Sequence, residues 1–462
     1  MNLKTTFLTR IVSVLLTFLI PLNLWMSFHP GAKIDPNVKE VLEKTGGFMK
    51  GCCHTNQDYD LLEGANIEWT RKDIPFPYNK DGSLSEYYLS WKKEMKQYHD
   101  NGIKVFAITP YPHDYIDYGL DPRKPENRAA IQKIAKFYVK DLAGIVGAFQ
   151  ITNEMGIDRF TLPLTLEEAV DFIAMHAEVM YKETRNSNVI IGYNIANPTV
   201  AIKMLKYSKW IDYIGLDLYI GCFEEFVHDI NLFPVLLGII RGVSQKPLIL
   251  CEFGYIGYGE ALSKSEKKEL INSYGFKSET DAIENMDEFL DELPPDMSNE
   301  IEELYPDATD EELGEMIFKG EYANHFYKSL PKNCKLYGYD HTPEGQAKFY
   351  RNLIPKLRKL DYLCGAFVYC WADSSHCYVC GQAECPVETG WGLIDGKGNP
   401  KPAYYAVRDG FSDAKKSPIQ AAADKINDSI ADLNAKRVEL VDRIRDKFEN
   451  FGIFAKPAKF NK

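Results

Sequence analysis

The chain has no excess of basic residues and no cluster of them. Its 462 residues include 54 Lys and Arg against 66 Asp and Glu, which gives a formal net charge of −12. A surface that binds nucleic-acid phosphates needs clustered Lys and Arg, so the composition argues against sequence-independent nucleic-acid binding. Low-complexity tracts, collagen-like repeats and a long heptad rod are also absent. With 45% apolar and 26% charged residues, the chain has the composition of a globular protein.

One long hydrophobic run is present, at the amino terminus. Lys4 and Arg10 precede largely apolar residues at 11–28, which is the pattern of an export signal. Two interpretations stay open for residues 1–32: a cleaved signal peptide, for which Pro30-Gly31-Ala32 is a poor cleavage site, and a membrane anchor of just sufficient length. In both, the basic residues favour a cytoplasmic amino terminus. We therefore expect the body of the protein to be secreted or membrane-anchored, outside the cytosol.

The ten cysteines are compatible with an oxidising compartment. Five of them lie close together in the sequence: Cys364, Cys370, Cys377, Cys380 and Cys385. Cys377 and Cys380 form a C-x2-C pair beside His376, but a second such pair or a nearby His pair, typical of zinc sites, is missing. We therefore favour one or two disulfides in this loop, with a zinc site, and with it a zinc-dependent hydrolase, as the minor alternative. Four others, Cys52, Cys53, Cys222 and Cys251, lie in apolar segments and are predicted to be buried hydrophobic residues.

From residue 46 the chain alternates short apolar segments with longer amphipathic ones, which predicts a parallel sheet covered by helices. Eight segments resemble strands: 47–53, 67–74, 103–109, 145–152, 188–195, 211–220, 247–253 and 363–371. Helices are predicted at 59–64, 85–101, 125–143, 165–183, 199–208 and 343–360, of which 59–64 is the weakest. Eight strands close a (β/α)8 barrel, so we predict an α/β fold with the barrel at 46–412.

Two segments fall outside this alternation. The first, 258–340, follows the seventh strand and includes residues 278–316, which contain sixteen Asp or Glu and no Lys or Arg. Because this helical insertion leaves the carboxyl end of a barrel strand, we expect it over the catalytic face, where it would restrict substrates to short chains or terminal residues. A solvated acidic helix pair without a role in chemistry is the equal alternative. The second segment, 419–450, is an amphipathic C-terminal helix whose mixed charges favour a protein contact over a membrane surface.

Two glutamates are predicted at the carboxyl ends of non-neighbouring strands, where barrel enzymes keep their catalytic groups. The fourth strand ends in Asn153-Glu154, and the seventh ends in Glu252. Two carboxyl groups that face one cleft are the equipment of glycoside hydrolysis, because one protonates the leaving oxygen while the other attacks or activates water. A carbohydrate substrate is therefore expected, with no cofactor and no metal.

These strand ends resemble those of the clan A retaining glycoside hydrolases, the 4/7 superfamily that includes families 2, 5 and 39. Besides Asn153-Glu154 and Glu252, the resemblance rests on Trp69-Thr-Arg71, Asp217-Leu-Tyr219, Trp371 and the tail at 391–404, and it covers residues 46–410. Each motif alone is weak, but their order along the predicted strand ends makes the combination fairly specific. Asp217 stands where many family 5 enzymes have a His.

The resemblance implies a retaining β-glycosidase in which Glu154 is the acid/base and Glu252 is the nucleophile. Glu154 then needs a raised pKa and Glu252 must be ionised, with the two carboxyl groups about 5–5.5 Å apart. The other implied site residues are Asn153 for the sugar 2-hydroxyl, Arg71 and Tyr219 as donors to Glu252, Trp371 as a platform under the sugar, and His113 as a further sugar contact. The alternative is a catalytically weak or inactive barrel that binds carbohydrate or protein.

Overall fold

The computed structural model describes residues 35–223 and 227–413. The predicted signal peptide or anchor at 1–32 and the predicted helix at 419–450 lie outside the described residues. Within the described ranges, no helix combines the length and the apolar character that crossing a membrane requires.

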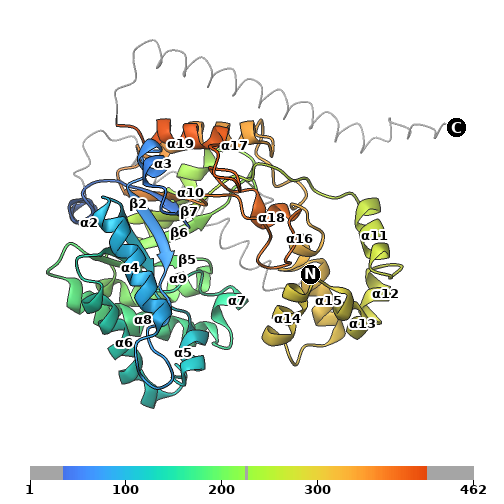
Figure 1. Ribbon diagram of the computed structural model, residues 1–462, viewed down its shortest axis with the longest axis horizontal. Helices are drawn as coiled ribbons and strands as arrows, with labels where there is room; N and C mark the ends of the chain where they lie inside the picture. Colours follow the sequence, from blue (N-terminus) through green and yellow to red (C-terminus); the bar gives the residue numbers. More distant parts are fainter. Residues whose placement is uncertain (1–34, 224–226, 414–462) are drawn as a thin grey trace, which may run out of the picture.

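Eight parallel strands form a closed barrel in the order β1 to β8 (Figure 1). Their bounds are β1 Met49–Cys53, β2 Trp69–Asp73, β3 Lys104–Ile108, β4 Val146–Gln150, β5 Ile190–Ile195, β6 Tyr213–Leu218, β7 Leu248–Phe253 and β8 Leu363–Val368. Each lies within the segment predicted for it, so the (β/α)8 barrel expected from the alternation and from the resemblance is confirmed. All eight predicted segments extended beyond the observed strand at one or both ends. At β4 the reason is local, because Thr152 has a φ of 54°, which an extended strand does not allow.

Helices follow the strands around the outside of the barrel. Their bounds are α2 Pro36–Thr45, α3 Tyr59–Gly64, α4 Glu86–Asp100, α5 Pro112–Tyr118, α6 Arg128–Asp141, α7 Asp158–Thr161, α8 Leu166–Thr184, α9 Pro198–Met204, α10 Leu232–Ser244, α17 Pro343–Leu357 and α19 Pro402–Phe411, with 3-10 turns at Pro125–Asn127 and Leu205–Trp210. A capping box begins α8, where the Thr165 side chain accepts from the Glu168 backbone and the Glu168 side chain accepts from the Thr165 backbone. The helices α2, α5, α7, α10 and α19 were not predicted from the sequence.

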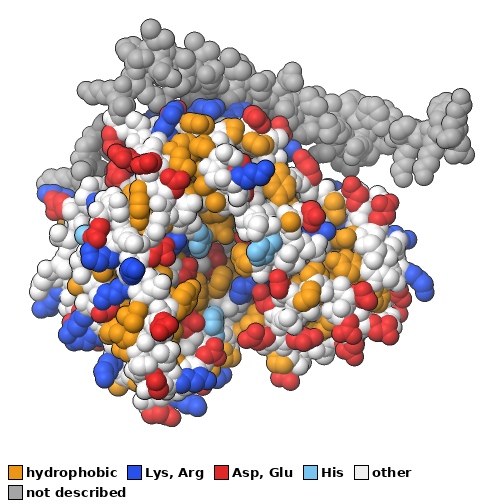
Figure 2. All heavy atoms as spheres, viewed as in Figure 1, with side chains coloured by type: hydrophobic (Ala, Val, Ile, Leu, Met, Phe, Trp, Pro, Cys, Tyr) orange, Lys and Arg blue, Asp and Glu red, His pale blue; other side chains and the backbone are white. Residues whose placement is uncertain are grey.

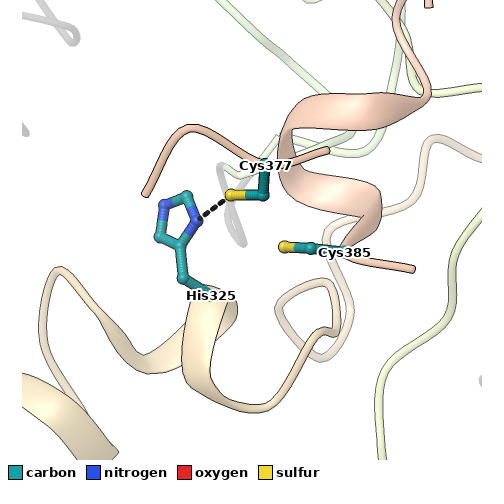
Figure 3. Close-up of side chains that lie close together, drawn as sticks. All are labelled: His325, Cys377 and Cys385. Atoms are coloured by element: carbon teal, nitrogen blue, oxygen red, sulfur yellow. Dashed lines mark hydrogen bonds between the residues drawn. The ribbon is translucent and has the colours of Figure 1, made fainter. Parts of the chain in front are cut away.

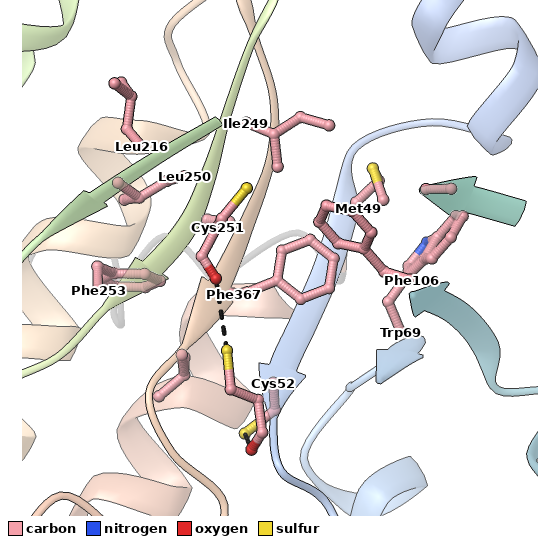
Figure 4. Packing of buried hydrophobic residues seen from close by; sticks show 14 of the residues in the cluster. Met49, Cys52, Trp69, Phe106, Leu216, Ile249, Leu250, Cys251, Phe253 and Phe367 are labelled. Atoms are coloured by element: carbon pink, nitrogen blue, oxygen red, sulfur yellow. Dashed lines mark hydrogen bonds between the residues drawn. The ribbon is translucent and has the colours of Figure 1, made fainter. Parts of the chain in front are cut away.

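Aromatic and aliphatic side chains from neighbouring strands fill the barrel interior (Figure 4). Phe106 and Phe367 meet edge to face, with their ring centroids 5.0 Å apart. Gly51 makes room for them, since a Cβ at that position would lie 2.1 Å from a ring carbon of Phe367. This packed interior closes the barrel below the carboxyl ends of the strands, which are left to carry the polar residues of a site.

Six short helices occupy the insertion between β7 and α17. They are α11 Lys264–Ser273, α12 Glu279–Ile283, α13 Met286–Glu292, α14 Pro295–Leu304, α15 Asp310–Phe318 and α16 Ala323–Phe326. In Figure 1 they form a lobe beside the barrel, with a hydrophobic core of their own. That core also contains Cys377, Val379, Cys380 and Cys385 from the segment after β8. We call residues 372–391 the cysteine loop; it includes the short helix α18, Pro386–Thr389.

The expected disulfides are absent. All ten cysteines are among the described residues; each is buried, and none is joined to another by a disulfide. Cys364 lies on β8 and Cys370 two residues after its end, and both belong to the barrel core, whereas Cys377, Cys380 and Cys385 belong to the core of the insertion. The five cysteines that are close in the sequence are therefore not close in space as one group, because β8 and the cysteine loop pack into different cores.

Candidate active site

Glu252 lies at the carboxyl end of β7 and is held by two donors. Arg71, on β2, donates from Nη1 to Glu252 Oε1 over 2.6 Å. Tyr219, which follows β6, donates its hydroxyl to the other oxygen, Oε2. Glu252 is 6% exposed and Arg71 is 1% exposed, so this charge pair is largely removed from water. Both donors expected for Glu252 are therefore in place, and they fix both oxygens of the carboxylate.

The Arg71 guanidinium connects the ends of β2, β4 and β7. Besides Glu252, it donates to Gln150 Oε1 from Nε and Nη2, at 3.1 and 2.9 Å, and from Nη2 to Asn153 Oδ1 at 2.7 Å. Gln150 in turn donates to Asn153 Oδ1 at 2.9 Å. Asn194, from β5, supplies a third donor to the same oxygen at 2.7 Å. The Asn153 amide is consequently locked, and its Nδ2 group is the donor left for a ligand.

Glu154 occupies an unusual backbone position. Its φ is 46°, in the left-handed region that non-glycine residues rarely adopt. The Asn194 side-chain oxygen holds this conformation by accepting from the Glu154 backbone N–H at 2.9 Å. The sharp turn after β4 is therefore held by a side chain of the next strand. In this position Glu154 lies close enough to Glu252 for the charge of Glu252 to raise its pKa.

The two glutamates have different electrostatic environments. Burial raises the pKa of Glu154 to about 8, and the negative charges of Glu252 and Glu388 add to the increase, while Arg71 opposes it. Glu252, in contrast, accepts from a guanidinium and a phenol. This is the pair of environments that a general acid and an ionised carboxylate need in one site.

Asp217 is a third carboxyl group in this cluster. It lies beside Glu252 in the register between β6 and β7, and its Oδ2 accepts from Asn194. Among the described residues, nothing hydrogen-bonds its buried Oδ1. Burial raises the pKa of Asp217 well above its usual range, and the charges of Glu252 and Glu154 contribute to the increase. Asp217 is therefore best placed as a neutral acid, which can donate a hydrogen bond.

Of two predicted substrate contacts, Trp371 is buried and His113 is exposed. Trp371 follows β8 but is fully buried, with its indole N–H donating to Asn56 Oδ1 at 2.8 Å. A ring with no exposed face cannot form a platform under a sugar, so that expectation is wrong for this structure. His113 is exposed at the rim, where it stacks on Tyr111 with ring centroids 5.4 Å apart. It is not hydrogen-bonded to either glutamate, and its predicted sugar contact stays a prediction.

Several residues face the glutamates that the sequence analysis did not single out. His54 follows β1 with a φ of 54°, and burial in the site lowers its pKa while the charges of Asp73 and Glu252 oppose the decrease. Tyr369, at the end of β8, donates to Glu388 Oε2 at 3.2 Å. Burial also raises the pKa of Glu388 to about 8. The composition of the loops gave no signal for these residues, although His54 and Tyr369 do follow predicted strands.

The insertion and the cysteine loop border one side of the site. Arg159, on α7 directly after the β4 turn, pairs with Glu300 of α14 at 2.6 Å. Its guanidinium also lies 5.3 Å from the centroid of the Tyr378 ring in the cysteine loop. Tyr378 is 55% exposed; desolvation raises its pKa, and the charges of Glu388 and Glu154 contribute to the increase. Figure 2 shows the molecule hollowed between the barrel and the insertion lobe.

No family model and no curated protein match the chain. Among solved structures, it is similar to a GH2 β-galacturonidase from Eisenbergiella tayi, with 11% identity over 80% of this chain and 51% of that one and a TM-score of 0.46. It is also similar to a family 39 glycoside hydrolase from Bacteroides cellulosilyticus WH2, with 12% identity over 80% and 64% of the two chains and a TM-score of 0.48. It is similar as well to a β-D-glucuronidase from Dictyoglomus thermophilum, with 13% identity over 80% of this chain and 51% of that one and a TM-score of 0.43. The chain thus spans 51–64% of the length of these three structures.

Proposed function

We propose that the protein is a retaining β-glycosidase that hydrolyses O-glycosidic bonds through a covalent intermediate on Glu252. One observation carries the proposal. Two glutamates at the ends of β4 and β7 interact electrostatically, and one has a raised pKa while the other accepts from Arg71 and Tyr219. A general acid and an ionised nucleophile in one site are what double displacement requires.

In the first step, a Glu252 oxygen forms a bond to the anomeric carbon while the bond from that carbon to the leaving oxygen breaks. The proton of Glu154 goes to the leaving oxygen. In the second step, water attacks the anomeric carbon, Glu154 takes the proton of that water, and the bond to Glu252 breaks. We expect the Asn153 Nδ2 group to donate to the sugar 2-hydroxyl; the three donors that its amide oxygen already accepts from support this role.

The structure also supplies a reason for Glu154 to change from acid to base. The charge of Glu252 is one of the causes that raise the Glu154 pKa. When Glu252 becomes an ester in the intermediate, that charge is lost, and the pKa of Glu154 falls. Glu154 is therefore protonated when it must donate a proton in the first step, and ionised when it must accept the proton of water in the second.

The test is a screen of aryl β-glycosides with the wild-type chain and two variants. Glu252→Gln should abolish turnover of every substrate that the wild type hydrolyses. Glu154→Gln should lose about 10²–10⁴-fold on substrates with poor leaving groups and much less on an activated aryl glycoside, which needs little protonation. If the Glu252→Gln variant keeps wild-type activity, the assignment is wrong. If no glycoside is hydrolysed but sugars bind, the protein is the inactive binding barrel instead.

Two features beyond the chemistry belong to the same proposal. The basic and apolar pattern at residues 1–28 supports export, with the barrel outside the cytosol. The ion pair between Arg159 and Glu300 supports an insertion that walls one side of the site, so short chains or terminal sugars are the expected substrates. The test of the second feature compares rates on a disaccharide and on the matching polymer.

A further inference from the structure

We infer that the protein contains a structural zinc site in which His325, Cys377, Cys380 and Cys385 bind one Zn²⁺ ion between the insertion and the cysteine loop. Three of the four come from a loop of nine residues, and the fourth comes from α16, 52 positions before Cys377. The site lies outside the glutamate cluster, and its existence does not depend on the proposed hydrolysis.

The side chains converge as zinc ligands do. The ligand atoms of His325, Cys377 and Cys385 all lie within 4.8 Å of one another, and Figure 3 shows them pointing toward a common centre. His325 Nδ1 lies 3.3 Å from Cys377 Sγ. In a tetrahedral site with Zn–S about 2.3 Å and Zn–N about 2.0 Å, nitrogen and sulfur ligands are about 3.5 Å apart. Only small shifts are needed to accept the ion.

Cys380 completes the set. Its buried thiol interacts electrostatically with the thiols of Cys377 and Cys385, and its backbone N–H donates to Cys377 Sγ at 3.5 Å, although its own sulfur is not one of the three ligand atoms that lie within 4.8 Å of one another. The spacing of Cys377 and Cys380 is the C-x2-C of structural zinc sites, and Gly381, with a φ of 67°, closes the turn. Three thiolates and one imidazole are a closed, four-coordinate donor set that suits Zn²⁺.

The surroundings are those of a buried thiolate cluster. The backbone N–H groups of Val379 and Cys380 donate to Cys377 Sγ at 3.4 and 3.5 Å. Such donors stabilise negative charge on sulfur and orient the ligands. All three cysteines are 0% exposed and His325 is 8% exposed. A disulfide would join only two of the three sulfurs, and it would not account for the third sulfur and the imidazole at the same place.

The ion would join two segments that border the active site. α16 belongs to the insertion, while the cysteine loop carries Tyr378 and Glu388, both of which interact with Glu154. Zinc would therefore hold the wall of the site in place without taking part in the reaction. The sequence alone does not reveal this ligand set, because the histidine beside the C-x2-C pair, His376, is exposed and bonded to Ser375, whereas His325 is distant in the sequence.

The test measures metal in the full-length chain, produced with zinc and then dialysed against metal-free buffer with a thiol reductant. Elemental analysis should find about one zinc per chain. His325→Ala and Cys385→Ser should lose more affinity than the roughly 10–100-fold that outer contacts contribute, while His325→Cys should retain the ion. Cys364→Ser is the matched control, since it removes a buried thiol of the barrel core and should keep zinc.

A second measurement covers variants that fail to fold. Cobalt added to the zinc-depleted wild type should give the thiolate charge-transfer and intense visible bands of a tetrahedral sulfur-rich site. Wild-type protein without zinc or cobalt binding would overturn the inference. So would ligand variants that hold zinc as the wild type does, or peptide mapping of a disulfide among Cys377, Cys380 and Cys385 in protein isolated without added reductant.

Discussion

The environment of Glu154 should set the alkaline limb of the pH–rate profile. With a pKa of about 8, about 90% of Glu154 is protonated at pH 7, whereas a group at the ordinary value of 4.5 would be about 0.3% protonated. The site thus raises the protonated fraction of Glu154 about 300-fold at neutral pH. The perturbation that removes this effect is Glu154→Gln.

The assay is kcat/KM against pH for a glycoside with a poor leaving group and for an activated aryl glycoside. For the wild type on the poor leaving group, the rate should fall about tenfold per pH unit above pH 8. In Glu154→Gln, the rate on the activated substrate should no longer show this limb. Glu388 is the necessary control, because its pKa is also raised to about 8 and its charge acts on Glu154.

Glu388→Gln should keep the limb and shift it to lower pH, since one of the charges that raise the Glu154 pKa is removed. The reasoning is refuted if Glu154→Gln retains the wild-type limb on the activated substrate. It is equally refuted if Glu388→Gln abolishes the limb, because the titrating acid would then be Glu388.

Three further outcomes are expected. In thermal unfolding, Glu154→Gln should become more stable relative to the wild type as the pH rises from about 5 to 8. The reason is that Glu154 ionises above pH 4.5 in the unfolded chain but only near pH 8 in the folded protein, so the wild type loses stability over this range. If the difference in stability between variant and wild type does not change with pH, the raised pKa of Glu154 is wrong. Arg71→Lys should lose most activity although it keeps the charge, since an ammonium cannot contact three acceptors in a fixed plane, and wild-type kinetics would contradict this. Asp217→Asn should bind substrate nearly as the wild type does, since the raised pKa favours the neutral acid that Asn mimics; a strong loss at pH 6 would show that the carboxylate is the working form.

The barrel and the placement of its carboxylates were predictable from the sequence, because both follow from local patterns. Strand segments alternate with amphipathic helices, and the residue that follows a barrel strand lies at the catalytic face whatever its identity. Glu154 and Glu252 could therefore be assigned to one face of the barrel from the order of the strands, whereas Arg71 and Tyr219 were implied as donors by the family resemblance.

Features that depend on long-range packing were not predictable. The left-handed backbone of Glu154 is held by Asn194 from the next strand. Trp371 occupies a strand-end position in the sequence, but packing against Asn56 and Tyr404 buries its ring. The cysteines divide between two cores because β8 ends inside the barrel while the following loop joins the insertion. In each case the deciding contact is made by a residue far away in the sequence.

The most direct test of the central claim is covalent labelling of the nucleophile. The wild-type chain would be incubated with a panel of β-configured cyclophellitol aziridines that differ in sugar configuration, digested, and mapped by mass spectrometry. Such reagents trap the ester that a retaining glycosidase forms with its substrate. The account predicts one label per chain on Glu252, slowed strongly in Glu154→Gln. A label on another carboxylate, or hydrolysis of a β-glycoside with inversion and no label, would contradict it.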